Sequence, residues 1–318
     1  MTNLSAFNGR LAGRVVAAAS VIVLASLSVG ACAQTLGIED TTLAPDPSAC
    51  FEEVVPYLWF FVNDIREDGE YPLAVIPQSA FTSLRDAFGV KADPTRGHVV
   101  ADARTCEKST GVRDGGPGDA GGVTFALRVG SETLPSNFFI NNDGRPDRDL
   151  KTTQTIVSLG GLLNAPAEQG TLTAFPADLE GSPSSSKTIL VRPGYLTTLR
   201  MEPSAGVPTP EVSPVPGRWS CVGSVLPPKP TSKTKFRITA KITDFSTGLR
   251  AAPAPDIRIR VCDPTSFGCD LADNETPDTV SGADGIAEID VENDGSGAWR
   301  GFLVVKGKVR KTTPKCRL

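Results

Sequence analysis

The sequence predicts an all-β protein with two tandem Greek-key β-sandwich domains, one short helix before the first sandwich, and an N-terminal signal peptide. From residue 97 onward, short β-branched and aromatic runs are separated by clusters of Gly, Pro, Asn and Asp. This rhythm is typical of a sandwich. The 318 residues exceed one small sandwich, so two domains are expected. The 31 Gly and 26 Pro residues predict many turns.

Residues 1–31 have the features of a signal peptide. Arg10 and Arg14 precede an apolar run, residues 15–29, which is shorter than the roughly 20 residues that span a bilayer core. The run ends in Val29-Gly30-Ala31-Cys32, which resembles a bacterial lipobox. In proteins with this signal the cysteine is lipidated and the chain is cut just before it. The resemblance therefore predicts that Cys32 is the lipidation site and the attachment to the membrane.

A second cleavage site competes with the lipobox. Ala31 and Ala33 flank the same cysteine and fit the A-x-A pattern of the ordinary signal peptidase, which would cut before Gln34 and release a soluble protein. The expected localisation is the cell envelope, as an outer-membrane lipoprotein. Otherwise the protein is expected to be periplasmic or secreted. Residues 32–50 are poor in apolar side chains and predict a tether.

The first domain is expected over residues 51–203. The aromatic and β-branched run at 54–62 predicts a buried strand. Residues 79–90 predict the one short helix, with Ser79 as N-cap and Gly89 as the stop. Its apolar face is expected to consist of Phe81, Leu84 and Phe88. Asn142-Asp143-Gly144 predicts a tight turn, because these residues tolerate a positive φ.

The second domain is expected over residues 231–318, after a proline-rich linker at 204–230. Its runs alternate polar and apolar residues with period two, which indicates half-buried strands. The chain stops without a counterpart of the Val191–Thr197 segment of the first domain. Either the aromatic strand at 54–62 completes a sheet from elsewhere in the chain, or the second sandwich is short and has an exposed edge.

The second domain resembles the carboxypeptidase regulatory-like module, a transthyretin-like β-sandwich. The places of its turn signals are held by Thr247-Gly248, Pro255 and Ala283-Asp284-Gly285. The first domain repeats the theme more loosely, as in multi-domain lipoproteins of Gram-negative bacteria, and has Leu159-Gly160-Gly161 where an acidic turn is expected. The resemblance implies a sandwich without imported catalysis, since the carboxypeptidase active site belongs to a separate domain.

The cysteines predict disulfides in an exported protein. If Cys32 is lipidated, an even number remains, as expected in an oxidising compartment. Cys262 and Cys269 enclose a turn-prone segment and are expected to form a local bond. The six cysteines allow 15 pairings in all, among which Cys50–Cys106 and Cys221–Cys316 would each stay within one domain. A zinc site is disfavoured, because the chain has no CxxC pair and one histidine.

Several functional classes lack their residues. The 32 basic and 36 acidic residues form no basic block before the C-terminal tail, so no nucleic-acid partner is expected. His98 is not followed by the glutamate of an HxxE zinc pair, and no GxSxG elbow, GxGxxG or P-loop pattern occurs. His98 is therefore interpreted as an ordinary residue at the start of a strand. No catalytic residue, metal ligand or cofactor is predicted.

Two other groups of residues could bind ligands. Carboxylates gather in two segments and could offer oxygen atoms to calcium, although neither segment matches an EF-hand and solvated turns are the favoured interpretation. These residues are Asp143, Asp147 and Asp149, and then Asp290, Glu292 and Asp294. Trp59, Trp219 and Trp299 could line a glycan or peptide surface, with core packing as the alternative. Trp299 is the candidate for a ligand surface.

These observations predict a non-enzymatic, envelope-anchored lipoprotein with a structural or adhesive role at the cell surface. Its expected partners are the membrane, through Cys32, and an envelope protein or a glycan. The alternative is a secreted carbohydrate- or peptide-binding module that works with a separate enzyme.

Overall fold

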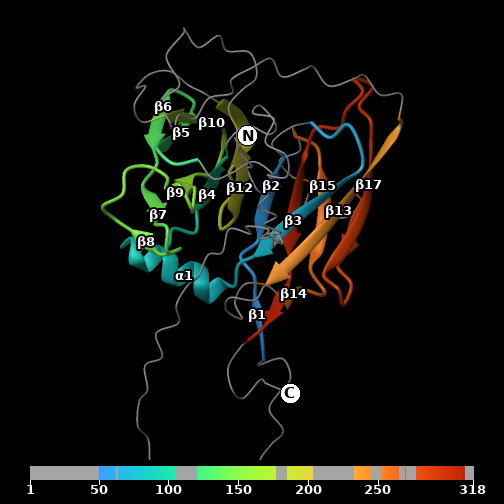
Figure 1. Ribbon diagram of the computed structural model, residues 1–318, viewed down its shortest axis with the longest axis horizontal. Coiled ribbons are helices and arrows are strands. Elements are labelled where there is room, and N and C mark those ends of the chain that lie inside the picture. Colours follow the sequence, from blue (N-terminus) through green and yellow to red (C-terminus); the bar gives the residue numbers. More distant parts are fainter. Residues whose placement is uncertain are drawn as a thin grey trace, which may run out of the picture.

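The computed structural model describes residues 50–61, 64–104, 120–176, 185–202, 233–244, 252–264, 269 and 277–311. The predicted signal peptide, Cys32, residues 33–49 of the tether and the linker at 204–230 lie outside the described residues. The described part contains nineteen strands and one helix, which confirms the all-β fold class and its single short helix. Figure 1 shows the strands gathered around a long central sheet.

The central sheet has nine strands, and two four-stranded sheets and a strand pair accompany it. The central sheet has the order β16 (Asp278–Val280), β15 (Arg258–Cys262), β18 (Phe302–Lys306), β2 (Tyr57–Phe60), β12 (Leu196–Met201), β4 (Arg96–Ala103), β9 (Leu159–Pro166), β7 (Phe138–Ile140) and β8 (Pro146–Asp147). The β5 sheet has the order β11 (Ser185–Leu190), β10 (Gln169–Pro176), β5 (Val123–Val129) and β6 (Glu132–Pro135). The β13 sheet contains β14 (Ala252–Pro253), β13 (Lys235–Asp244), β17 (Ile286–Glu292) and β3 (Gly69–Val75). The remaining pair is β1 (Phe51–Glu53) with β19 (Lys308–Arg310).

The central sheet crosses the predicted domain boundary at residue 203. Strand β2 pairs in parallel with β12 and antiparallel with β18, so it joins the two halves of the chain (Figure 1). Strand β3 adds in parallel to β13, and β1 pairs with β19. The aromatic run at 54–62 thus completes a sheet elsewhere in the molecule, which resolves the alternative left open by the sequence. Three N-terminal strands assigned to the first domain pair with strands of the second.

The core lies on both faces of the central sheet. Neighbouring side chains of a strand point to opposite faces, so Tyr57 belongs to one buried cluster and Leu58 to the other. Leu303 and Val304 of β18 divide in the same way. The β13 sheet and the helix pack on the Tyr57 side, and the β5 sheet packs on the Leu58 side. Strands β2 and β18 are therefore buried on both faces, which explains their continuous apolar sequences.

The helix α1 (Gln78–Ala87) begins one residue before the predicted N-cap. Pro77 occupies the N-cap position without a side-chain cap, and the Ser79 amide instead donates to Glu52 Oε1 at 2.5 Å. The N-cap prediction at Ser79 is therefore wrong. The predicted stop is confirmed, because Gly89 has φ +68° and its N–H donates to the Asp86 carbonyl at 2.9 Å. Phe81 is buried beneath the helix.

Two of the glycine turns named in the sequence form as expected, and Thr247-Gly248 lies outside the described residues. Gly144 has φ +75°, and its N–H donates to the Asn141 carbonyl at 2.9 Å in the β7–β8 hairpin. Gly285 has φ +74°, and its carbonyl accepts the N–H of Ile242 at 2.8 Å. A Cβ at Gly285 would lie 2.4 Å from the Ile242 carbonyl oxygen, so only glycine fits this close approach.

Candidate functional site

A cavity of about 150 Å³ lies between α1, the loop that follows it and the start of β4. Apolar and polar side chains share its wall. Its charged residues are Arg85, which lies in the helix, and Asp93, which lies in the loop after the helix. The lining residues are Val55, Gln78, Phe81, Arg85, Ala92, Asp93, Pro94, His98 and Gly194.

A bulge in β4 holds His98 against the helix. The register between β4 and β9 shifts between Gly97 and Val99, so no residue of β9 lies opposite His98 in the ladder. The His98 N–H donates instead to the Tyr195 carbonyl at 2.9 Å. Bulges commonly redirect a side chain in this way. The imidazole is 5% exposed and meets the Phe81 ring edge-on, with the centroids 4.8 Å apart.

The hydrogen bonds of His98 define its tautomer. The Asn164 N–H donates to His98 Nδ1 at 3.1 Å, from a backbone with φ +57° that non-glycine residues seldom adopt. An Nδ1 that accepts leaves the proton on Nε2. Burial, and then the nearby Arg85 cation, lowers the pKa of His98 to about 4. At neutral pH the ring is therefore uncharged, with an Nε2–H donor.

Arg85 supplies the positive charge of the cavity. Its side chain is 15% exposed, and its Nε is buried without a hydrogen-bond partner in the part of the chain that the structure describes. Its Nη2 lies 3.9 Å from Asp86 Oδ1, a weak ion pair to a largely exposed carboxylate. The guanidinium thus retains donor capacity beside the neutral imidazole.

The predicted ligand surface at Trp299 is corrected by the structure. Trp299 is 6% exposed and packs edge-on against Phe61, with ring centroids 5.7 Å apart. Its backbone forms a two-bond bridge with Ile65. The ring therefore lies in the core beside Phe61, which directly follows β2. Trp59 is half-buried against the same cluster, and Trp219 lies outside the described residues.

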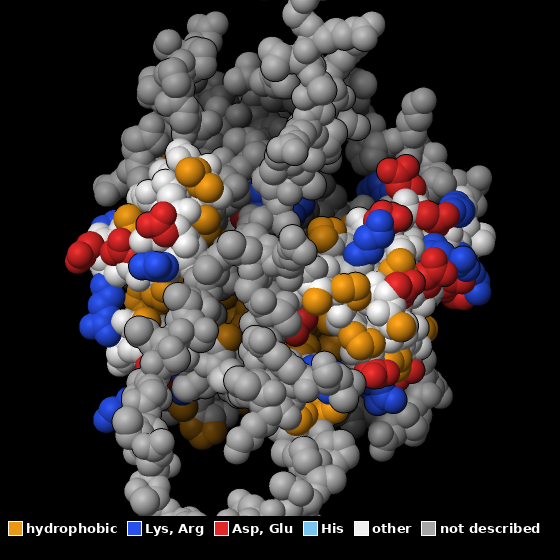
Figure 2. Space-filling model, turned by 60° about the horizontal axis from the view of Figure 1, so that its bottom comes forward, with side chains coloured by type: hydrophobic (Ala, Val, Ile, Leu, Met, Phe, Trp, Pro, Cys, Tyr) orange, Lys and Arg blue, Asp and Glu red, His pale blue; other side chains and the backbone are white. Residues whose placement is uncertain are grey.

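The carboxylates considered for calcium have other partners. Asp290 pairs with Arg237 at 2.9 Å, and Glu292 lies 3.5 Å from Lys235 on the outer face of the β13 sheet. Figure 2 shows positive and negative side chains intermixed on the side of the molecule where this sheet lies. No group of three or more His, Cys, Asp and Glu residues suited to a metal occurs among the described residues.

The other acidic residues of these two segments lie in local turns, to which Asp147 and Asp294 contribute their carboxylates and Asp143 and Asp149 their backbone amides. Asp147 accepts the N–H of Asp149 at 2.9 Å, and Asp294 accepts the N–H of Ser296 at 2.8 Å. The amide of Asp143 donates to Asn141 Oδ1 at 3.0 Å, within the β7–β8 turn. These contacts agree with the favoured interpretation of the carboxylates as turn residues.

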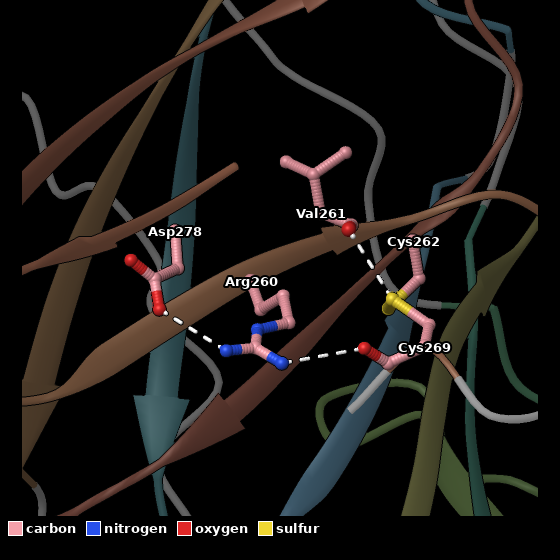
Figure 3. The surroundings of a disulfide bond; sticks show 5 residues. All are labelled: Arg260, Val261, Cys262, Cys269 and Asp278. Atoms are coloured by element: carbon pink, nitrogen blue, oxygen red, sulfur yellow. Dashed lines mark hydrogen bonds and ion pairs between the residues drawn. A yellow bond between two sulfur atoms is a disulfide. The ribbon is translucent and has the colours of Figure 1, made fainter. Parts of the chain in front are cut away.

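The local disulfide Cys262–Cys269 is confirmed (Figure 3). Both cysteines are buried in the cluster on the Leu58 side, and the Val261 carbonyl oxygen lies 3.3 Å from Cys269 Sγ. The Arg260 guanidinium joins the Cys269 carbonyl to Asp278, with both contacts at 3.3 Å. The disulfide therefore joins Cys269 to the end of β15 in the core, and Arg260 links Cys269 to β16.

The other cysteines are described only in part. Cys50 is disulfide-bonded, and its partner lies outside the described residues. Cys106, Cys221 and Cys316 also lie outside them, so the pairings Cys50–Cys106 and Cys221–Cys316 stay predictions.

Comparisons with known proteins leave the family open. No protein-family model matches the chain, and no curated protein matches it. Among solved structures, the Bacillus anthracis TIE protein is similar with a TM-score of 0.22 and 12% identity. The match covers 62% of this chain and 26% of that one, and a score this low carries no argument. In the described part, no helix has the length and hydrophobicity needed to cross a bilayer.

The amino-acid pattern does not indicate the residues that give the cavity its character. The pattern around His98 predicts an ordinary strand residue, and no motif marks Arg85 or Asn164. The one available signal is the position of Arg85, which follows Phe81 and Leu84 at the end of the apolar face of the helix. A long basic side chain at such a position can lie along buried apolar surface. The contact between Asn164 and His98 joins residues that are far apart in the sequence and depends on the bulge.

Proposed function

We propose that the protein is a non-enzymatic β-sandwich lipoprotein, anchored in the cell envelope through Cys32, that binds or spaces another envelope component. The observation that carries the proposal is the buried Cys262–Cys269 disulfide. Disulfides persist in oxidising compartments, and the lipobox-like segment at Cys32 supplies the route to one. The expected partner is an envelope protein or a glycan, and not a nucleic acid, because charges of both signs are intermixed on the face in Figure 2.

The β-sandwich core supports a structural role. The shared central sheet joins both halves through β2, so the described strands form one body that is suited to a spacer or a binding scaffold. We also propose that the second half of the chain belongs to the carboxypeptidase regulatory-like family. The Gly285 turn between two strands supports this assignment. The alternative, a secreted carbohydrate- or peptide-binding module, is weakened because the Trp299 ring, its main candidate for a ligand-binding surface, is buried.

The anchor is tested by labelling cells with a palmitate analogue and measuring the mass of the mature N-terminus. We expect labelled protein that begins at modified Cys32, and we expect Cys32→Ala to lose the label and leave the membrane fraction. The matched control is Ala33→Gln, which removes the small residue that ordinary cleavage before Gln34 requires and keeps the cysteine. It is expected to remain labelled.

An unlabelled wild-type chain that begins at Gln34 would contradict the anchor and favour the secreted module. Hydrolysis of a peptide, glycan or ester by the purified mature chain, absent from a mock purification, would contradict the non-enzymatic part of the proposal.

A further inference from the structure

We propose that the cavity beside His98 binds a small organic carboxylate. The ligand's carboxylate group contacts the Arg85 guanidinium and the Nε2–H of His98, and its short apolar part lies against Phe81. This site goes beyond the anchoring role and does not depend on it, because every residue that carries it belongs to the described fold.

The polar groups of the cavity call for an anion. Arg85 can only donate hydrogen bonds, and the tautomer fixed by Asn164 makes Nε2 of His98 a donor as well. Arg85 Nε has no partner in the described part of the chain, although it is shielded from water. Leaving such a donor unsatisfied costs roughly 1 to 3 kcal/mol, so a ligand oxygen placed there is stabilising. A guanidinium also suits the planar geometry of a carboxylate.

The acidic residue at the rim is occupied by its own partners. Asp93 Oδ1 accepts the N–H of Thr95 at 2.9 Å and the hydroxyl of the same residue at 2.6 Å. Asp93 Oδ2 lies 3.5 Å from Arg96 Nε. These contacts lower the pKa of Asp93 and hold its carboxylate within the loop. Asp93 is thus held by the Arg96 cation at the start of β4 and by the Thr95 hydroxyl, and it leaves Arg85 available to the ligand.

The size and apolar wall of the cavity limit the ligand. A volume of about 150 Å³ matches an engineered lysozyme cavity that holds benzene, so a ligand of about six non-hydrogen atoms fits. Val55, Phe81 and Pro94 provide the apolar part of the wall. A bare inorganic anion would leave these contacts unused, whereas a short-chain carboxylate uses both kinds of wall.

The single histidine of the chain makes the test direct. In the folded mature protein at pH 7, the one imidazole Cε1–H resonance is followed by NMR while propionate is added at constant ionic strength. We expect a saturable shift and a rise in the pKa of His98, because a bound anion favours the charged ring. We expect Arg85→Gln to weaken propionate binding at least tenfold. The matched control Arg128→Gln, on the exposed face of β5, is expected to bind as the wild type does.

Three outcomes would overturn the proposal. They are the lack of a saturable shift in the wild-type protein, equal loss of binding in Arg85→Gln and Arg128→Gln, and chloride producing the same shift at the same concentration as propionate. The amide spectrum of Arg85→Gln is recorded first. If it shows that this variant has not folded, Arg85→Gln is replaced by Arg85→Lys, which keeps the charge and is expected to bind more weakly than wild type because it lacks the planar fork.

Discussion

His98 shows how one buried side chain makes stability depend on pH. Its pKa is lowered to about 4 in the fold, against an ordinary value near 6.5, mainly by burial and then by Arg85. The groups that face it are Arg85 on α1 and Asp93 in the loop before β4. Because the folded pKa lies below the unfolded one, the unfolded chain binds more protons between these two values. Stability from the neutral ring is therefore complete above about pH 6.5 and is lost as the pH falls toward 4.

We expect the free energy of unfolding to fall by about 1 to 3 kcal/mol more in the wild type than in His98→Asn between pH 7 and pH 4. The asparagine cannot titrate, and its side-chain oxygen can accept the N–H that Asn164 donates to Nδ1. Urea unfolding at several pH values provides the measurement. Curves for the two proteins that stay parallel over this range would show that His98 does not cause the acid loss.

At the scale of single elements, β1 determines which cysteine can reach Cys50. Strand β1 pairs with β19, and the Lys311 N–H donates to the Cys50 carbonyl at 2.8 Å. Cys316 follows Lys311 by a stretch of chain that can extend about 17 Å. By contrast, β12 pairs in parallel with both β2 and β4, so β4 runs in the same direction as β2. Strand β4, which precedes Cys106, therefore leads away from β1 (Figure 1). Through Leu196, His98 is at the level of Tyr57, so the end of β4 at Ala103 lies about 17 Å beyond that level.

We therefore expect Cys50 to be bonded to Cys316, in place of the Cys50–Cys106 pairing inferred from domain boundaries. Cys106 and Cys221 then remain as a pair. Mass spectrometry of unreduced peptides from the exported protein measures the pairing, and Cys262–Cys269 serves as the internal control because the structure defines it. A peptide that joins Cys50 to Cys106 would contradict the assignment.

The same element-scale physics explains the helix. The spacing of Phe81, Leu84 and Phe88 correctly predicted a helix with one buried face, since this pattern depends only on local geometry. Its start was misplaced because Ser79 is engaged by Glu52, a residue of β1. A contact between distant segments thus overrode a local capping preference.

For the whole molecule, the continuous central sheet predicts that the two halves of the chain unfold together. Strand β2 contributes to both halves, with Leu196 opposite Tyr57 on one side and Phe302 opposite Phe60 on the other. Separation of the halves would expose β2 or β18, both of which are buried on two faces. Exposed strands of this kind promote aggregation.

We expect a chain cut at an engineered protease site within 204–230 to remain a single particle in size-exclusion chromatography and to unfold in one calorimetric transition. Reduction of the disulfides before the measurement removes covalent links between the pieces and leaves the strand pairing as the test. Two separately eluting, folded pieces would show that the halves are independent domains.

The amino-acid pattern was sufficient for those features that depend on near neighbours. Period-two alternation and glycine turns predicted the strands and the Gly285 and Gly144 turns, and the short spacing of Cys262 and Cys269 predicted their bond. Three-dimensional packing was needed to place β1, β2 and β3 with the C-terminal half, to bury Trp299, and to bring Arg85 and Asn164 to His98. These contacts join distant segments, and their energies depend on burial and on strand register, which local sequence does not encode.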